Sequence, residues 1–127
     1  MRGISESRKL WARHKYKVLS KSHKSYLEIR EYLKSDAPDY ACLQEKIAFA
    51  LEREESPKDC INAYQHVWGY FKKQASVEEK EAFLVLLEDY RNGRKQEESL
   101  RNYVRALLVK YPNEYLSESS LIGGGGL

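Results

Sequence analysis

Residues 56–74 read SPKDCINAYQHVWGYFKKQ, and this stretch decides the fold class. Its apolar side chains recur mostly at spacings of three and four residues, which is the period of one face of a helix. Those side chains are Cys60, Ile61, Tyr64, Val67, Trp68 and Phe71. Ser56 is a favoured N-cap residue, and Pro57 suits the first helical position, where a missing N–H leaves no bond unmade. The pattern predicts a helix over residues 57–74.

The same period continues on both sides of this stretch. Ser76 and Glu79 form a capping-box pattern, and Asn92-Gly93 is a typical helix end. The helices expected from apolar spacing cover residues 5–34, 39–54, 57–74, 76–91 and 96–110, with one more turn near Tyr115. Strand-like alternation is absent from the sequence. The prediction is an all-α, single-domain bundle of five to six helices with short connections.

Length and composition limit the class of protein. The 127 residues suit one domain, expected over residues 1–117, followed by a flexible Gly-rich tail over residues 118–127. No apolar run approaches the roughly 18 residues of a membrane span, and a secretory signal is absent, so we expect a cytoplasmic protein with no membrane partner. The two cysteines and three histidines lack the spacings of metal or redox sites. We therefore expect no bound metal and no cofactor.

Positive charge is concentrated at the N-terminus. Residues 1–24 contain eight lysines and arginines against the single acid Glu6, and the rest of the chain carries a net charge of −4. Helical spacing places Arg13, Lys17, Lys21 and Lys24 on one face. Charge alone leaves two interpretations open, phosphate binding and a solvated face that keeps the protein soluble. The candidate phosphate contacts are Arg8, Arg13, Lys17, Lys21 and Lys24.

A polar stripe lies on the predicted 57–74 helix, apart from its apolar face. It comprises Asn62, Gln65, His66, Gly69 and Lys73. Amides, an imidazole and a lysine on one face could read bases or hold a polar ligand, and glycine allows close approach of a backbone or ligand. The alternative is a buried hydrogen-bond network that joins this helix to a neighbour.

This segment also carries a family resemblance. The residues that carry it are Asn62, Gln65, His66, Val67, Gly69, Tyr70, Phe71, Lys72 and Lys73, then Glu79-Lys80 and Asp89-Tyr90-Arg91 with Gly93. In their order and spacing they resemble the YbgA-like domain family, and further similarity extends over residues 9–117. In that family the domain occurs alone or fused behind an iron–sulfur domain that resembles thiouracil desulfidases. The fusions are implicated in removing sulfur from thiolated uridine in transfer RNA, which implies that the helical domain handles the RNA.

The resemblance favours a non-catalytic RNA-binding module, with transfer RNA as the expected RNA and a separate desulfidase-like protein as the expected partner. Two cysteines cannot supply the three thiolates expected of the cluster domain, so no desulfidase activity is expected from this chain alone. The candidate polar and aromatic contacts are Tyr16, Asn62, Gln65, His66, Gly69, Tyr70, Lys72, Lys73 and Arg91. The alternatives are a protein-interaction domain and an enzyme that uses His66 with Asn62 or Arg91.

Overall fold

Helix α4 (Pro57–Trp68) forms where the sequence predicts a helix, and it packs against the helices over residues 4–21 and 77–91. In the computed structural model, which describes residues 4–123, the Ser56 hydroxyl accepts a hydrogen bond from the Asp59 amide at 3.4 Å. The α-helix ends six residues earlier than predicted, because the amides that follow Trp68 bond to carbonyls three residues back. Such bonds tighten the chain into turns, and these turns still bury Phe71.

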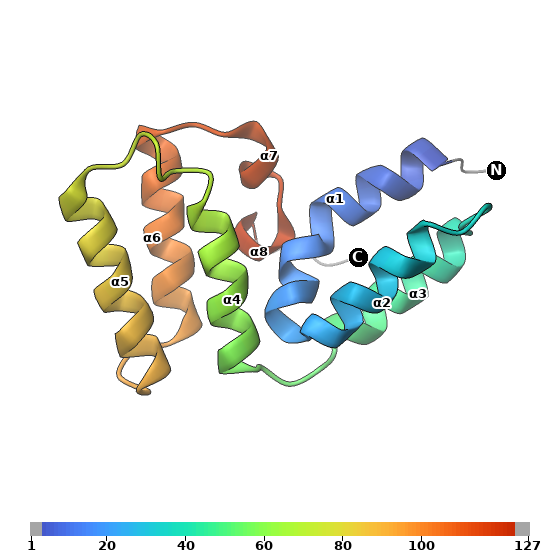
Figure 1. The fold of residues 1–127 in the computed structure, drawn as a ribbon, viewed down its shortest axis with the longest axis horizontal. Coiled ribbons are helices and arrows are strands. Elements are labelled where there is room, and N and C mark those ends of the chain that lie inside the picture. Colours follow the sequence, from blue (N-terminus) through green and yellow to red (C-terminus); the bar gives the residue numbers. More distant parts are fainter. Residues whose placement is uncertain (1–3, 124–127) are drawn as a thin grey trace.

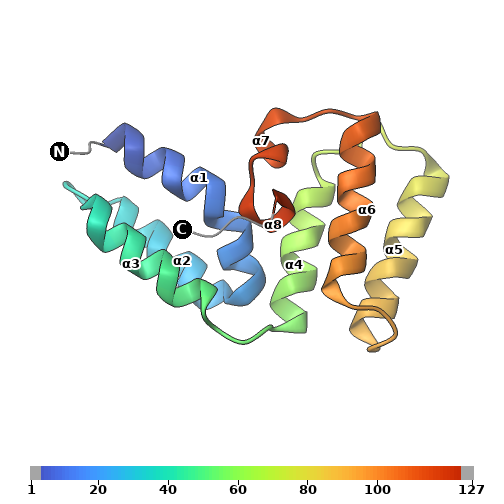
Figure 2. The same cartoon turned by 180° about the vertical axis from the view of Figure 1, so that it is seen from behind.

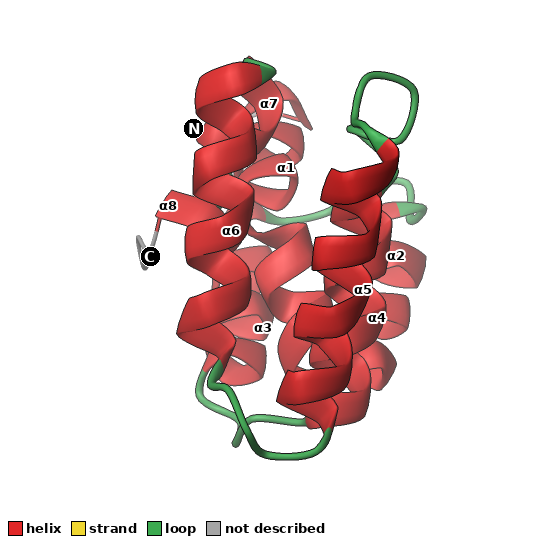
Figure 3. Ribbon diagram, turned by 90° about the vertical axis from the view of Figure 1, so that its left-hand side faces the viewer, coloured by secondary structure: helices red, strands yellow, loops and turns green. Residues whose placement is uncertain are grey.

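Seven further helices lie in the described chain, joined by turns and loops. They are α1 (Ile4–Lys21), α2 (His23–Leu33), α3 (Tyr40–Leu51), α5 (Val77–Arg91), α6 (Glu97–Lys110), α7 (Glu114–Ser117) and α8 (Ser120–Gly123). No strand occurs within residues 4–123, as Figure 3 shows, so the all-α prediction is confirmed. None of the described helices is long and apolar enough to cross a lipid bilayer.

The first predicted helix is divided in two at Ser22. The backbone of Ser22 is extended, with φ −160° and ψ 107°, and its hydroxyl accepts a hydrogen bond from the Ser25 amide at 3.0 Å. Serine competes with helical bonding in this way because its short side chain can cap a new helix. The Asp59 carboxylate of α4 also accepts a hydrogen bond from the His23 amide at 3.1 Å. The prediction of one helix over residues 5–34 is therefore wrong at this position.

The break at Ser22 folds α2 back beside α1. In Figure 1, α1, α2 and α3 form one group of helices, and α4, α5 and α6 stand side by side in another. Val18, Ile29 and Leu43 belong to the hydrophobic cluster of the first group, and Tyr64, Phe83 and Leu100 belong to the larger cluster of the second. Leu19 lies in the larger cluster although Val18 lies in the smaller one. Val18 and Leu19, which are adjacent in α1, thus connect the two hydrophobic clusters.

The C-terminal segment packs against the body of the protein as far as residue 123. Residues 119–122 are buried, and α8 lies between α1 and α6, as Figure 2 shows from behind. The Ser120 hydroxyl is hydrogen-bonded to Nδ1 of His14 at 2.9 Å, and Arg105 Nε donates to the Ile122 carbonyl at 2.8 Å. The flexible tail predicted from residue 118 therefore differs from the structure over these residues, because their apolar side chains complete the larger cluster. Residues 124–127 of that predicted tail lie outside the described residues.

Candidate nucleic-acid interface

The polar stripe of α4 lines an open groove of about 680 Å³. We call it the motif groove; its lining residues are His23, Pro57, Lys58, Asp59, Ile61, Asn62, Gln65, His66 and Arg91. Asn62, Gln65 and His66 come from α4, Arg91 from the end of α5, and His23 from the start of α2. Three helices thus bring amide, imidazole and guanidinium groups to one depression.

The side chains of the motif groove are not tied to one another. Gln65 and His66 are exposed and Asn62 is half-buried. Within residues 4–123, none of these three side chains has a hydrogen-bond or ion-pair partner. The interpretation of the stripe as a buried hydrogen-bond network is therefore wrong. The amides retain both donors and acceptors for a ligand.

Charge in the motif groove is mixed. Arg91 donates from Nη1 to the Glu88 carboxylate at 2.6 Å, which leaves other guanidinium donors available. Asp59 contributes a carboxylate, and one of its oxygens accepts from the His23 amide. Such a site suits a ligand that is recognised by hydrogen bonds to its edges more than by net charge.

The remaining motif residues lie at the C-terminal end of α4. Gly69 ends the helix with ordinary helical angles, and a Cβ there would come within 3.1 Å of the His66 carbonyl oxygen. This close approach involves its own helix, whereas the sequence suggested another backbone or a ligand. Lys72 and Lys73 are exposed in the turns that follow and do not line the motif groove.

Three tyrosines form a cluster beside this helix end. The hydroxyls of Tyr16 and Tyr70 are hydrogen-bonded to each other at 2.7 Å. The Tyr115 ring stacks on the Tyr70 ring, with 6.0 Å between their centroids. Tyr16 itself is only 8% exposed, and burial, followed by the hydrogen bond with Tyr70, raises the pKa of its phenol. The exposed rings are those of Tyr70 and Tyr115. Of the three rings, Tyr70 and Tyr115 are therefore accessible to a ligand and Tyr16 is not.

The five predicted phosphate contacts do not form a single stripe. Arg13 is exposed on α1, while Lys17 and Lys21 line a cavity of about 240 Å³ together with Glu55 and Glu97. Burial, and then the nearby Lys21 and Arg101, lower the pKa of the Lys17 ammonium. The two lysines thus share their cavity with carboxylates, which weakens their attraction for phosphate.

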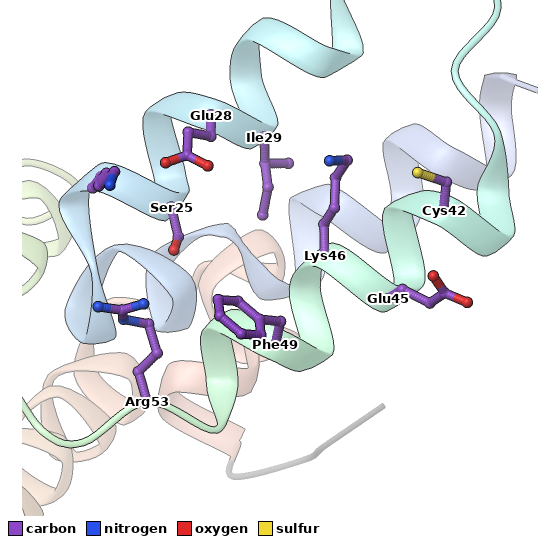
Figure 4. Close-up of a pocket in the computed structure, with 9 residues that line it drawn as sticks. Ser25, Glu28, Ile29, Cys42, Glu45, Lys46, Phe49 and Arg53 are labelled. Atoms are coloured by element: carbon purple, nitrogen blue, oxygen red, sulfur yellow. The ribbon is translucent and has the colours of Figure 1, made fainter.

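The other two predicted contacts lie on opposite sides of the helix break. Lys24 lines a groove between α2 and α3 that also contains Glu28, Glu45 and the ring of Phe49 (Figure 4). Arg8 lines a separate groove near the start of α1. The helix break at Ser22 explains the placement of Lys24, since spacing along a continuous helix no longer applies beyond it.

The two cysteines lie in different parts of the protein and do not share a site. Burial raises the pKa of the Cys60 thiol to about 12, so the thiol is protonated at neutral pH. Cys42 lines the groove between α2 and α3, whereas Cys60 lines the cavity with Lys17. Among the described residues, no group of three or more His, Cys, Asp and Glu side chains is arranged to hold a metal ion.

Two side chains near these surfaces, Lys15 and His23, were not anticipated from the sequence. Lys15 lies over the rings of Tyr16 and Tyr115, at 5.2 and 5.4 Å from their centroids. His23 reaches the motif groove from α2. Spacing within one helix gives no signal for such residues, because they meet the site only through packing between helices.

Comparison with known proteins gives a family but no function. The family model "Protein of unknown function (DUF1722)" matches residues 15–123. The uncharacterized protein YbgA of Escherichia coli K12 is 24% identical over 78 residues, which cover 61% of this chain and 46% of YbgA. This chain thus spans less than half of that relative, and no solved structure matches. Because the family model covers all but a short N-terminal part of the described residues, the chain belongs to the DUF1722 family.

Proposed function

We propose that this protein is a non-catalytic RNA-binding module, with transfer RNA as its ligand, that acts beside a separate desulfidase-like enzyme of thiolated-uridine metabolism. The observation that carries the proposal is the free hydrogen-bonding capacity of the motif groove. Asn62 and Gln65 present amides and His66 an imidazole, and these side chains have no partner within residues 4–123. Exposed groups of this kind can pair with the edges of unstacked bases, which is how single-stranded parts of RNA are read.

Cations on neighbouring helices support binding to the RNA backbone. Arg13 is exposed on α1, and Lys58 and Arg91 border the motif groove itself. Contacts with phosphates position an RNA, while contacts with base edges give specificity. We therefore assign phosphate contacts to these cations and base contacts to Asn62, Gln65 and His66.

The partner enzyme would supply the chemistry. The protonated thiol of Cys60 is a poor nucleophile, and Cys42 lines a different cavity. The two thiols therefore do not converge on one site, and two cysteines cannot supply the three thiolates expected of the cluster domain. The assignment of a desulfidase-like partner comes from the family resemblance and from the chemistry that this chain lacks.

Binding of transfer RNA at two salt concentrations tests the proposal. We expect micromolar or tighter binding at low salt, weakening by a factor on the order of 40 between roughly 50 and 200 mM salt if Arg13, Lys58 and Arg91 each contact one phosphate. The triple variant Asn62→Ala, Gln65→Ala, His66→Ala should bind at least roughly tenfold more weakly, because each lost base contact has no replacement. Absence of binding at low salt contradicts the proposal.

A matched control separates groove chemistry from a general loss of surface polarity. Gln44 on α3 and Asn102 on α6 are exposed amides outside the motif groove. The double variant Gln44→Ala, Asn102→Ala should bind transfer RNA as the wild type does. If the affinity for transfer RNA falls equally in both variants, the loss does not come from the side chains of the motif groove.

A protein-interaction domain is the second candidate, and one surface favours it. Val77, Leu84 and Val85 on α5 are 68%, 50% and 61% exposed. Exposed apolar side chains on one helix are typical of contact with another protein. Capture of a partner that survives nuclease treatment and is lost in Leu84→Ser, together with no binding to transfer RNA, would favour this function.

A further inference from the structure

A groove near the start of α1 has the composition of a nucleotide site. We call it the N-terminal groove; its lining residues are Ile4, Ser7, Arg8, Trp11, Ala12, Lys15, Leu33, Lys34, Ser35, Pro38 and Tyr115. The first half of α1, the end of α2 and α7 form its walls. Its volume is about 410 Å³, within the range of about 300 to 1,000 Å³ that is typical of small-molecule sites.

The charged side chains that line the N-terminal groove are all positive. Arg8, Lys15 and Lys34 line it, with no Asp or Glu among the lining residues. The motif groove contains Asp59, and the groove between α2 and α3 contains Glu28 and Glu45. Among residues 4–123, the Arg8 guanidinium has no hydrogen-bond, ion-pair or ring partner. Lys34 Nζ lies 3.6 Å from a carboxylate oxygen of Glu31, which is outside the lining. The unpaired Arg8 guanidinium, with the Lys15 ammonium in the same groove, favours an anion with several oxygens.

Ser7 gives a second, independent indication of a ligand. It is 1% exposed, and its hydroxyl has no hydrogen-bond partner within the described residues. Buried hydroxyls in proteins are almost always hydrogen-bonded, because an unpaired one loses its bonds to water without replacement. Since Ser7 lines the groove, an oxygen of a bound anion could accept its hydrogen bond.

Aromatic and apolar side chains supply the rest of the groove. The Trp11 ring packs against the Tyr26 ring, with 5.6 Å between their centroids, and the Tyr115 ring stacks on Tyr70. Leu33 and Pro38 also line the groove. Flat rings fixed by their neighbours are suitable surfaces for a nucleobase, because every base has a π-face that can stack.

We propose that the N-terminal groove binds a nucleoside monophosphate unit, with its phosphate on Ser7, Arg8 and Lys15 and its base against Trp11 and Tyr115. The unit is an unpaired nucleotide of an RNA or a free mononucleotide, and these two share the same chemistry. In its RNA form the inference rests on the proposed function and adds a pocket for one splayed nucleotide to the base contacts of the motif groove.

Calorimetric titration of the full chain with uridine 5′-monophosphate, uridine and inorganic phosphate tests the proposal. We expect the monophosphate to bind at least roughly tenfold more tightly than either part alone, because the groove offers contacts to both. Arg8→Gln and Ser7→Ala should each weaken this binding by roughly 10-fold or more. No binding of the monophosphate, or equal binding of phosphate alone, overturns the proposal.

The controls are neighbours on the same helix. Lys9 and Ser5 are both exposed. Nζ of Lys9 lies 3.9 Å from Oε1 of Glu6. Lys9→Gln and Ser5→Ala should leave the affinity unchanged. Ser7→Ala should also retain the thermal stability of the wild type, since it removes a hydroxyl that has no partner. Loss of affinity with retained stability separates ligand binding from a role in folding, and equal loss in the controls overturns the proposal.

Titrations with single-stranded oligouridylate and with transfer RNA distinguish the source of the nucleotide. An RNA source predicts that Arg8→Gln weakens binding of both RNA and monophosphate, and a free nucleotide predicts that only the monophosphate responds. If the monophosphate fails to bind while transfer RNA still requires Asn62, Gln65 and His66, this inference fails and the proposed function stands. If transfer RNA fails to bind while the monophosphate responds to Arg8→Gln, the proposed function fails and the groove remains a nucleotide site.

Discussion

At the scale of the residue, burial and existing hydrogen-bond partners together decide which polar side chains are available for binding. His14 and His66 have the same side chain, but His14 is 1% exposed and bonded to Ser120, whereas His66 is exposed. The same contrast separates Tyr16 from Tyr70, although the two hydroxyls touch. Residue type therefore identifies a candidate contact, and burial together with an existing hydrogen-bond partner decides whether its polar group is free for a ligand.

His14 makes the stability of the protein depend on pH. Burial, and then Arg13 and Lys17, lower its pKa to about 4 from the ordinary 6.5. Between these values the unfolded state binds the proton more readily, so stability is present above about pH 6.5 and is lost as pH falls toward 4. We expect a loss of about 2 kcal/mol in the free energy of unfolding between pH 7.5 and 5 that is absent in His14→Gln.

Urea unfolding at both pH values measures this difference. His66→Gln, which removes an exposed imidazole, is the control for the loss of one histidine elsewhere. An identical pH dependence in wild type and His14→Gln would show that the buried imidazole does not contribute to it.

At the scale of the element, helix ends determine the direction of the chain. Ser56, Ser76 and Asp39 cap their helices through side-chain bonds to backbone amides, and Ser76 and Glu79 complete the capping box expected from sequence. Ser22 does the same within a segment whose apolar spacing predicts one continuous helix. This cap separates α2 from α1 and moves Lys24 away from Lys17 and Lys21.

Replacing the Ser22 cap should destabilise the protein. Ser22→Ala removes the acceptor for the Ser25 amide and should lower the free energy of unfolding by about 1 kcal/mol, measured by chemical denaturation. Ser22→Gly should cost less relative to wild type, because glycine is tolerated at N-caps. Ser5→Ala, at an exposed serine of α1, serves as the control. Unchanged stability in Ser22→Ala would mean that the cap does not fix the break.

At the scale of the whole molecule, the C-terminal helices close the gap between the two groups of helices. Leu116, Leu121 and Ile122 are 0%, 4% and 2% exposed and belong to the larger hydrophobic cluster. Tyr115 of α7 reaches the N-terminal groove, so the end of the chain completes a surface formed by its beginning. Both the core and this candidate site therefore depend on the docking of α7 and α8.

Truncating a buried side chain of α8 should reveal this dependence. Ile122→Ala should lower the free energy of unfolding by about 2 to 4 kcal/mol, because it leaves a cavity in the core. Val109→Ala, at a side chain that is 84% exposed, should change it by less than about 0.5 kcal/mol. Denaturant titration compares the two variants, and equal stabilities would indicate that residues 118–123 form the flexible segment suggested by composition.

Local patterns predict the helices well and the residues of the candidate binding grooves only in part. The α4 stripe is one such success, because Asn62, Gln65 and His66 share a face through helical spacing alone. The grouping of Arg91 and His23 with this stripe depends on contacts between helices. The same is true of Ser7, whose burial and missing partner have no signature in the sequence.

The sequence by itself determined the helical class, most helix boundaries and the location of the polar stripe, since these follow from periodicity and capping along neighbouring residues. Tertiary structure alone decided that the stripe is exposed and that the basic residues are divided among separate cavities. It also decided that residues 119–122 are buried. The physical reason is that exposure and charge clustering depend on which helix faces meet, and the packing of distant segments sets those contacts.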